Sequence, residues 1–179
     1  MKILVSYASA HGSTAEIAEF IGRLLTVLGA EVTVASASDV HDISTYDAVV
    51  VGSAIHANMW LQAMSQFLER FEVQLRERPT FLFITCIRVM ETSGREHVLH
   101  EYLYHPTLEK IGVSPDAVGV LAGKIEINAI SWEERWLLAS NYDGTEASKL
   151  VNHDYRDWAA IGEWTMGIAR ALKLKPVLG

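Results

Sequence analysis

The feature that most constrains the fold is a series of short apolar runs, separated by segments with helical periodicity. Runs of this length and character are typical of strands that are buried on both faces. Strands alternating with helices predict a parallel sheet with helices on both faces, because each parallel strand needs a crossover connection. The expected strands are Lys2–Ala8, Val32–Ala35, Asp47–Gly52, Thr80–Cys86 and Ala117–Ala122.

The helical segments carry recognisable start and stop signals. Ser13 followed by Glu16 predicts an N-cap with a capping box, and Gly29 marks the end of that helix. A second helix is expected from about Asn58 or Met59, and a third over about 93–112. A short helix over Trp132–Ala139, a turn at Asp143-Gly144 and a last helix over Asp157–Leu172 complete the expected order.

Length and composition favour one cytoplasmic domain over residues 1–179, with an insertion at about 124–155 before the last helix. With 179 residues, half of them hydrophobic, the chain can bury a core without disulfides. Cys86 is the only cysteine, which suits a reducing compartment. We expect no integral membrane segment, because no apolar run approaches the roughly 20 residues of a membrane helix. A net charge of −7 argues against nucleic acid and fits a basic partner or simple solubility.

In a parallel sheet, ligands bind at the carboxyl ends of the strands, where the loops Ser9–Thr14, Ser53–Asn58 and Cys86–Gly94 would meet. The first loop offers backbone amides, a helix N-terminus and hydroxyl groups, which together suit an anion. It contains no lysine or arginine and one glycine, so it matches neither a nucleoside triphosphate loop nor a dinucleotide turn. A phosphomonoester site remains, and an ordinary capped turn explains the same residues.

The residues of this loop carry a family resemblance. "SAHGST" after the first strand resembles the phosphate loop of flavodoxins, with Ser9 and Thr14 on the outer hydroxyl positions and His11 in place of the middle threonine. "VVVGSAIHANMWL", "GVLAGKI" and "DYRDW" resemble the flavodoxin-domain proteins related to menaquinone-dependent protoporphyrinogen oxidase. The resemblance extends over essentially the whole chain. It implies a flavodoxin-like, doubly wound, five-stranded parallel α/β sheet and bound FMN.

The expected FMN contacts follow from the three loops. Reduced flavin carries negative charge near N1, so His56 and Arg88 are the candidates for a catalytic role beside the flavin. The loops Ser53–Asn58 and Cys86–Met90 hold no acidic residue, which favours two-electron chemistry. Trp60 is a candidate ring contact, although it also begins an apolar stripe that favours core packing. The candidate set is Ser9, Ala10, His11, Gly12, Ser13, Thr14, Ser53, Ala54, Ile55, His56, Ala57, Asn58, Trp60, Thr85, Cys86, Ile87, Arg88 and Val89.

Other reactive residues favour less specific interpretations. Cys86 ends a buried strand and is expected to be inert rather than a redox thiol. His97, His100 and His105 lack further ligands at metal-site spacing, so no metal is expected. The segment from Lys124 to Tyr142 is the expected cover for a substrate or partner, and its Trp132 and Trp136 are expected to pack on the domain.

These observations favour an FMN-dependent oxidoreductase that exchanges electrons with a quinone or similar organic acceptor, with protoporphyrinogen oxidase-like chemistry as one version. In that family the covering segment is basic and aromatic, whereas here it carries Glu126, Glu133 and Glu134, so the porphyrinogen substrate stays open. The alternatives are a one-electron carrier that docks a basic redox partner protein, or a binding module without turnover. The sequence also leaves the oligomeric state open, a homodimer included.

Overall fold

The central sheet has the strand order β2-β1-β3-β5-β6, and every neighbouring pair in that order is parallel. This computed structural model describes residues 1–91, 93–103, 112–141 and 151–175. The chain leaves β1 toward β2 on one side and later returns to β3 on the other side. The strand order therefore reverses at β1, which places a ligand crevice at the carboxyl ends of β1 and β3.

The sheet strands coincide with the apolar runs of the sequence. They are β1 (Lys2–Ala8), β2 (Glu31–Ser36), β3 (Ala48–His56), β5 (Thr80–Thr85) and β6 (Ala117–Leu121). Two short antiparallel pairings lie apart from this order: β4 (Met59–Trp60) pairs with the end of β3, and β7 (Lys124–Ile125) pairs with β8 (His153–Asp154).

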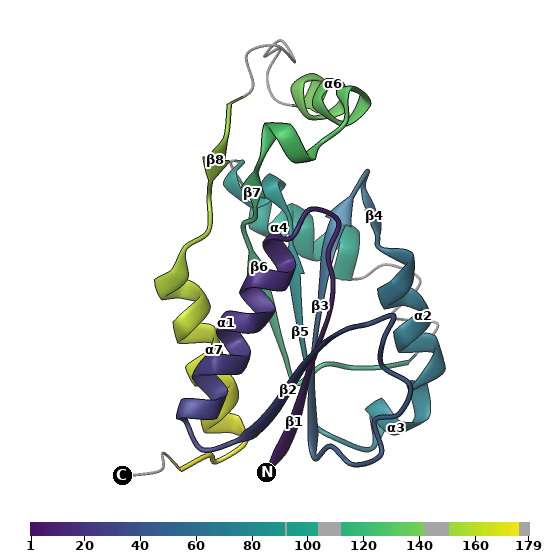
Figure 1. Ribbon diagram of the computed structural model, residues 1–179, viewed down its shortest axis with the longest axis vertical. Coiled ribbons are helices and arrows are strands. Elements are labelled where there is room, and N and C mark those ends of the chain that lie inside the picture. Colours follow the sequence, from purple (N-terminus) through teal and green to yellow (C-terminus); the bar gives the residue numbers. More distant parts are fainter. Residues whose placement is uncertain (92, 104–111, 142–150, 176–179) are drawn as a thin grey trace.

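Helices cover both faces of the sheet (Figure 1). One face carries α1 (Ser13–Val27) and α7 (Trp158–Ala171), and the other carries α2 (Gln62–Arg70), α3 (Glu72–Arg76) and α4 (Gly94–Val98). The remaining elements are η1 (Ile87–Met90), η2 (Leu99–Leu103), η3 (Ile127–Ala129) and α6 (Trp132–Asn141). The flavodoxin-like architecture expected from the sequence is thus confirmed.

Alternating residues of the strands feed two separate cores. Ile3 and Val5 pack with α1 and α7, whereas Leu4 packs on the opposite face with α2. Neighbouring strands of the sheet also pack tightly: a Cβ atom at Gly52 of β3 would lie 1.9 Å from the buried ring of Phe83, its partner on β5. Glycine is therefore required at this position by the packing of the central strands.

Several local predictions were wrong in their boundaries. The second helix begins at Gln62 rather than at Asn58 or Met59, because the chain first makes the β3–β4 hairpin. The helix expected over about 93–112 is α4 followed by a π-helical turn, η2. Its later part, His105, the turn at Asp143-Gly144 and part of the 124–155 insertion lie outside the described residues.

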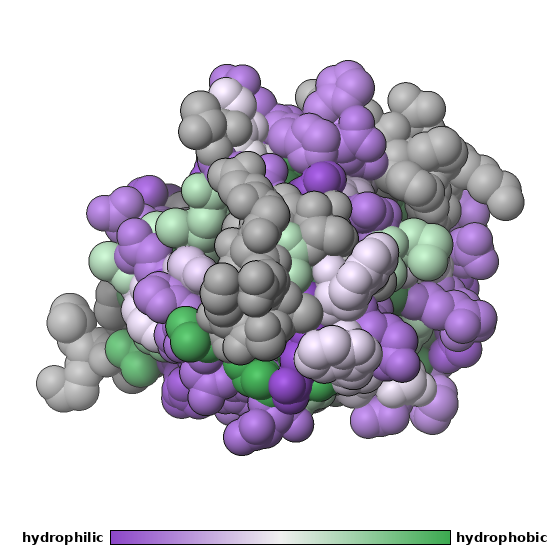
Figure 2. All heavy atoms as spheres, turned by 90° about the horizontal axis from the view of Figure 1, so that it is seen from above, coloured by the Kyte–Doolittle hydropathy of each residue, from purple (hydrophilic) through white to green (hydrophobic). Residues whose placement is uncertain are grey.

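The β7–η3–α6 segment stands above the carboxyl ends of the sheet strands (Figure 1). Seen from that end, the described surface is largely hydrophilic, with small apolar patches (Figure 2). Among the described residues, none of the helices has the length and apolar character needed to cross a membrane.

Candidate functional site

A cavity of about 240 Å³ lies at the carboxyl ends of the strands, beneath the β7–η3–α6 segment. The loop after β1, the end of β3 and the segment after β5 form its walls, and residues 123–138 complete it. Most of the candidate residues line it: Ala10, His11, Ser13, Ala54, Ile55, His56, Ala57, Asn58, Thr85, Cys86, Ile87 and Arg88. The sequence candidates did not include the remaining lining residues, Gly123, Lys124, Ile125, Ile130, Glu134 and Leu138.

The loop before α1 differs from the predicted capped turn. The N-cap is Gly12, whose φ of 88° lies in the left-handed region that favours glycine, and Ser13 is already helical. The Gly12 amide donates to Ser9 Oγ at 3.0 Å, which fixes the loop. Thr14 is fully buried, and its hydroxyl has no hydrogen-bond partner among the described residues. An unpartnered buried hydroxyl at the first turn of α1 fits the phosphate position that the resemblance implies.

Glu16 does not form the expected capping box with Ser13. Its carboxylate instead accepts hydrogen bonds from Lys124 Nζ and Arg156 Nη1, each at 2.6 Å. These hydrogen bonds, Lys124 first and Arg156 second, lower the pKa of the Glu16 carboxyl. The ion pairs fasten the paired strands β7 and β8 to the start of α1, and Lys124 is at the same time part of the cavity wall.

The end of β3 reaches the cavity through a strained turn. Ala57 and Asn58 both have positive φ, 48° and 60°, as a two-residue type I′ hairpin requires. Such a conformation costs roughly 1–2 kcal/mol for a residue with a Cβ atom. The Tyr102 hydroxyl donates to Asn58 Oδ1 at 3.0 Å and holds the turn in place.

The other candidates lie behind the cavity wall. Trp60 is buried, packs in the core beside α2, and donates from its indole nitrogen to the Tyr102 carbonyl at 3.0 Å. Ser53 is fully buried, and its hydroxyl donates to the Ala54 carbonyl. Ser9, Gly12, Thr14 and Val89 are likewise absent from the lining. Trp60 therefore supports the wall from the core side, where its apolar stripe predicted it to pack.

Arg88 lines the cavity, but its guanidinium also contacts neighbours from its own segment. Nη1 lies 3.0 Å from His97 Nε2, and Nε lies 3.7 Å from Glu91. His97 therefore lies beside Arg88. Cys86 is buried, and burial raises the pKa of its thiol, which fits the expectation that it is inert.

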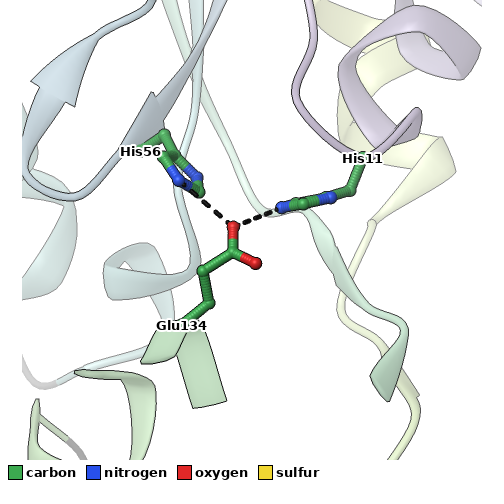
Figure 3. Close-up of side chains that lie close together, drawn as sticks. All are labelled: His11, His56 and Glu134. Carbon is green, nitrogen blue, oxygen red and sulfur yellow. Dashed lines mark hydrogen bonds and ion pairs between the residues drawn. The ribbon is translucent and has the colours of Figure 1, made fainter. Parts of the chain in front are cut away.

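Three side chains that are far apart in the sequence converge at the cavity. His11 Nε2 lies 2.8 Å from Glu134 Oε1, and His56 Nε2 lies 3.2 Å from the same oxygen (Figure 3). His11 comes from the loop before α1, His56 from the end of β3 and Glu134 from α6. The sequence predicts that the loops carrying His11 and His56 meet, but it gives no signal that Glu134 joins them.

Glu134 also belongs to the only capping box that we find in the described residues. The Ser131 amide donates to Glu134 Oε2, and the Glu134 amide donates to Ser131 Oγ at 3.2 Å, directly before α6 begins. Burial opposes ionisation, but the hydrogen bonds from the Ser131 amide and His11 outweigh it and lower the pKa of the Glu134 carboxyl. The capping box thus aims one carboxylate oxygen at the two imidazoles.

The tryptophans of the covering segment do not pack on the domain as expected. Trp132 and Trp136 are each 61% exposed. The residues of this segment that line the cavity are instead Lys124, Ile125, Ile130, Glu134 and Leu138. The positions four residues apart in α6, Glu134 and Leu138, therefore form the face that meets the cavity.

Comparisons with known proteins agree with this geometry. The family model described as a flavodoxin domain matches residues 4–150. Protoporphyrinogen IX dehydrogenase (quinone) of Escherichia coli K12 is 25% identical over 182 residues, which span 99% of each protein.

Solved structures share the fold. A flavodoxin from the domain Archaea is 18% identical with a TM-score of 0.58, covering 97% of this chain and 99% of that one. Flavodoxin 2 of Bacillus cereus is 17% identical with a TM-score of 0.57, covering 96% and 99%. The chain belongs to the flavodoxin-domain family, and its cofactor is FMN.

Proposed function

We propose that this protein is an FMN-dependent oxidoreductase that passes electrons between a reductant and a quinone or similar small organic acceptor, as a cytoplasmic enzyme. The observation that carries the proposal is the apolar cover: Ile125, Ile130 and Leu138 face the cavity from the segment above the strand ends. A small planar molecule could be held between this cover and the cofactor, with its apolar surface removed from water.

The chain's own groups have distinct roles in this proposal. The loop from Ser9 to Thr14 would hold the phosphate by its amides and hydroxyls, and the end of β3 and the segment after β5 would flank the flavin ring. FMN, when bound, supplies the electron exchange. The imidazole of His56 and the guanidinium of Arg88 line the cavity, where each can stabilise negative charge on the reduced ring.

The full-length relative from Escherichia coli supports a quinone-linked reaction, since its name is protoporphyrinogen IX dehydrogenase (quinone). For this chain, the porphyrinogen itself is the less favoured substrate. The segment over the cavity brings the carboxylate of Glu134 to the cavity wall and carries exposed Glu126 and Glu133. When no cation is bound there, these carboxylates would repel a substrate that itself bears carboxylates.

The test is the rate at which a water-soluble quinone reoxidises the reduced, FMN-loaded protein without oxygen. We expect saturable reoxidation that slows at least about tenfold in Ile130→Glu, since a charge in the apolar cover costs well over 1.4 kcal/mol. Val151→Glu is the matched control, because Val151 is exposed and does not line the cavity. Equal rates in both variants would refute the proposed acceptor site and favour a one-electron carrier.

A further inference from the structure

We propose that His11, His56 and Glu134 form a binding site for one divalent transition-metal ion of the zinc class, beside the flavin in the same cavity. The three residues are the one group of potential ligands with this geometry among the residues that the structure describes. Their ligand atoms all lie within 4.8 Å of one another. The inference does not depend on which electron acceptor the protein uses.

The donor set is appropriate to such an ion. Two imidazole Nε2 atoms and one carboxylate oxygen form a three-ligand set that also occurs in catalytic zinc sites, where a fourth position stays open. Metal–ligand distances of about 2.0–2.2 Å at tetrahedral angles place neighbouring donor atoms about 3.3–3.6 Å apart. The His56–Glu134 separation of 3.2 Å is close to this range, and the two imidazole Nε2 atoms lie within 4.8 Å of each other. The His11–Glu134 separation of 2.8 Å needs to widen by about half an ångström or more.

The surroundings hold the ligands in place. The Ser131 amide binds Glu134 Oε2, so the other oxygen, Oε1, is presented to the two rings (Figure 3). Such a support fixes a ligand before the ion arrives. The three side chains are 21–39% exposed, which allows an ion to enter.

The backbone and the imidazole of His11 serve different parts of the site. His11 belongs to the phosphate loop through its backbone, whereas its imidazole points across to Glu134 (Figure 3). All three ligands line the cavity, so the open coordination position faces the space where the acceptor is expected. An ion here would also tie α6 to the loop after β1 and to the end of β3.

The experiment titrates the FMN-loaded protein with Zn²⁺ by calorimetry and with Co²⁺ by absorption, at wavelengths beyond the flavin band. We expect one ion per chain, and a Co²⁺ absorption spectrum typical of an ion with four ligands. Glu134→Gln should weaken binding by more than about 100-fold, since even the loss of a supporting group costs 10–100-fold. Gln keeps the capping box, so the start of α6 should survive this substitution.

His11→Gln and His56→Gln should have the same effect. His100→Gln should leave ion binding unchanged, because the His100 side chain is exposed and does not line the cavity. Three results would overturn the proposal: no saturable binding, equal affinity in all variants, or release of FMN in proportion to the ion bound. Should the protein fail to bind FMN, the same Zn²⁺ titration on the flavin-free protein still decides the metal site separately.

Discussion

Replacement of Arg156 by alanine tests how the segment over the cavity is fastened to the domain. The Arg156 side chain is only 6% exposed. It donates to Glu16 Oε2 and Asp154 Oδ2 at 2.6 Å each, and to Asp154 Oδ1 at 2.8 Å. Its guanidinium also lies 4.6 Å from the centre of the Trp158 ring. The substitution removes all of these contacts at once.

The size of the effect follows from the exposure of the partners. Breaking a fully buried ion pair costs about 3–5 kcal/mol. The Glu16 and Asp154 side chains are 45% and 47% exposed, so water can solvate them after the loss of Arg156. We therefore expect a net loss of about 2 kcal/mol for the ion pairs, and about 0.5–1 kcal/mol more for the contact with Trp158. At about 2–4 °C per kcal/mol, the melting temperature should fall by roughly 5–12 °C.

The assay is urea and thermal unfolding of the wild type, Arg156→Ala, Arg156→Lys and Arg170→Ala. Lysine keeps the charge but not the paired donors, so it should recover only part of the loss. Arg170 is exposed, and its removal should change stability by less than about 0.5 kcal/mol. A melting temperature of Arg156→Ala equal to that of Arg170→Ala would refute the claim that these ion pairs hold β7 and β8 to the domain.

Three further predictions concern the core, the phosphate loop and acid stability. Gly52→Ala should lower the free energy of unfolding, measured in urea, by about 1–3 kcal/mol, because its Cβ atom would overlap the buried ring of Phe83. An unchanged urea midpoint of unfolding would contradict that packing. Thr14→Val should leave the flavin-free protein as stable as the wild type or more stable, because the Thr14 hydroxyl has no hydrogen-bond partner in the described protein. The same substitution should weaken FMN binding about tenfold or more in a fluorescence titration, because the cofactor loses the hydrogen bond from this hydroxyl. The pKa of Glu16 is lowered by Lys124 and Arg156 and that of Asp154 by Arg156, so their stabilisation is present above about pH 4.5 and is lost as the pH falls through the lowered pKa values. The double variant Glu16→Gln, Asp154→Asn should therefore lose less stability than the wild type between about pH 5 and 2.

The sheet could be predicted because local pattern and long-range structure agree there. Residues such as Ile3, Leu4 and Val5 are apolar in succession, and in the structure they fill the cores on both faces of the sheet. The loops that follow these strands then have to meet at one end of the sheet. For that reason most of the cavity lining could be named from the sequence.

The wrong predictions arose where contacts between residues far apart in the sequence decide the structure. Ser13 and Glu16 match a capping box, but Lys124 and Arg156 compete for the Glu16 carboxylate from more than a hundred residues away. The capping box at Ser131 and Glu134 has the same pattern and does form, so the pattern alone did not decide between the two.

The hairpin after β3 was missed because its turn has alanine and asparagine where glycine is usual. Ala57 and Asn58 take left-handed conformations that Ala57 in particular does not favour locally. The tertiary contact from Tyr102 to Asn58 stabilises the turn instead. Glu134 was missed as a cavity residue because its approach to His11 and His56 depends on how the covering segment folds back over the sheet.

The most direct measurement is the visible absorption of the purified, FMN-loaded protein during stepwise reduction without oxygen. We predict a flavin band that is retained through purification or restored by added FMN, and that bleaches in one two-electron step. The absence of a flavin band after FMN is added would contradict the redox function altogether. A reduction in two well-separated one-electron steps would contradict the proposed two-electron enzyme and indicate a carrier for a basic redox partner.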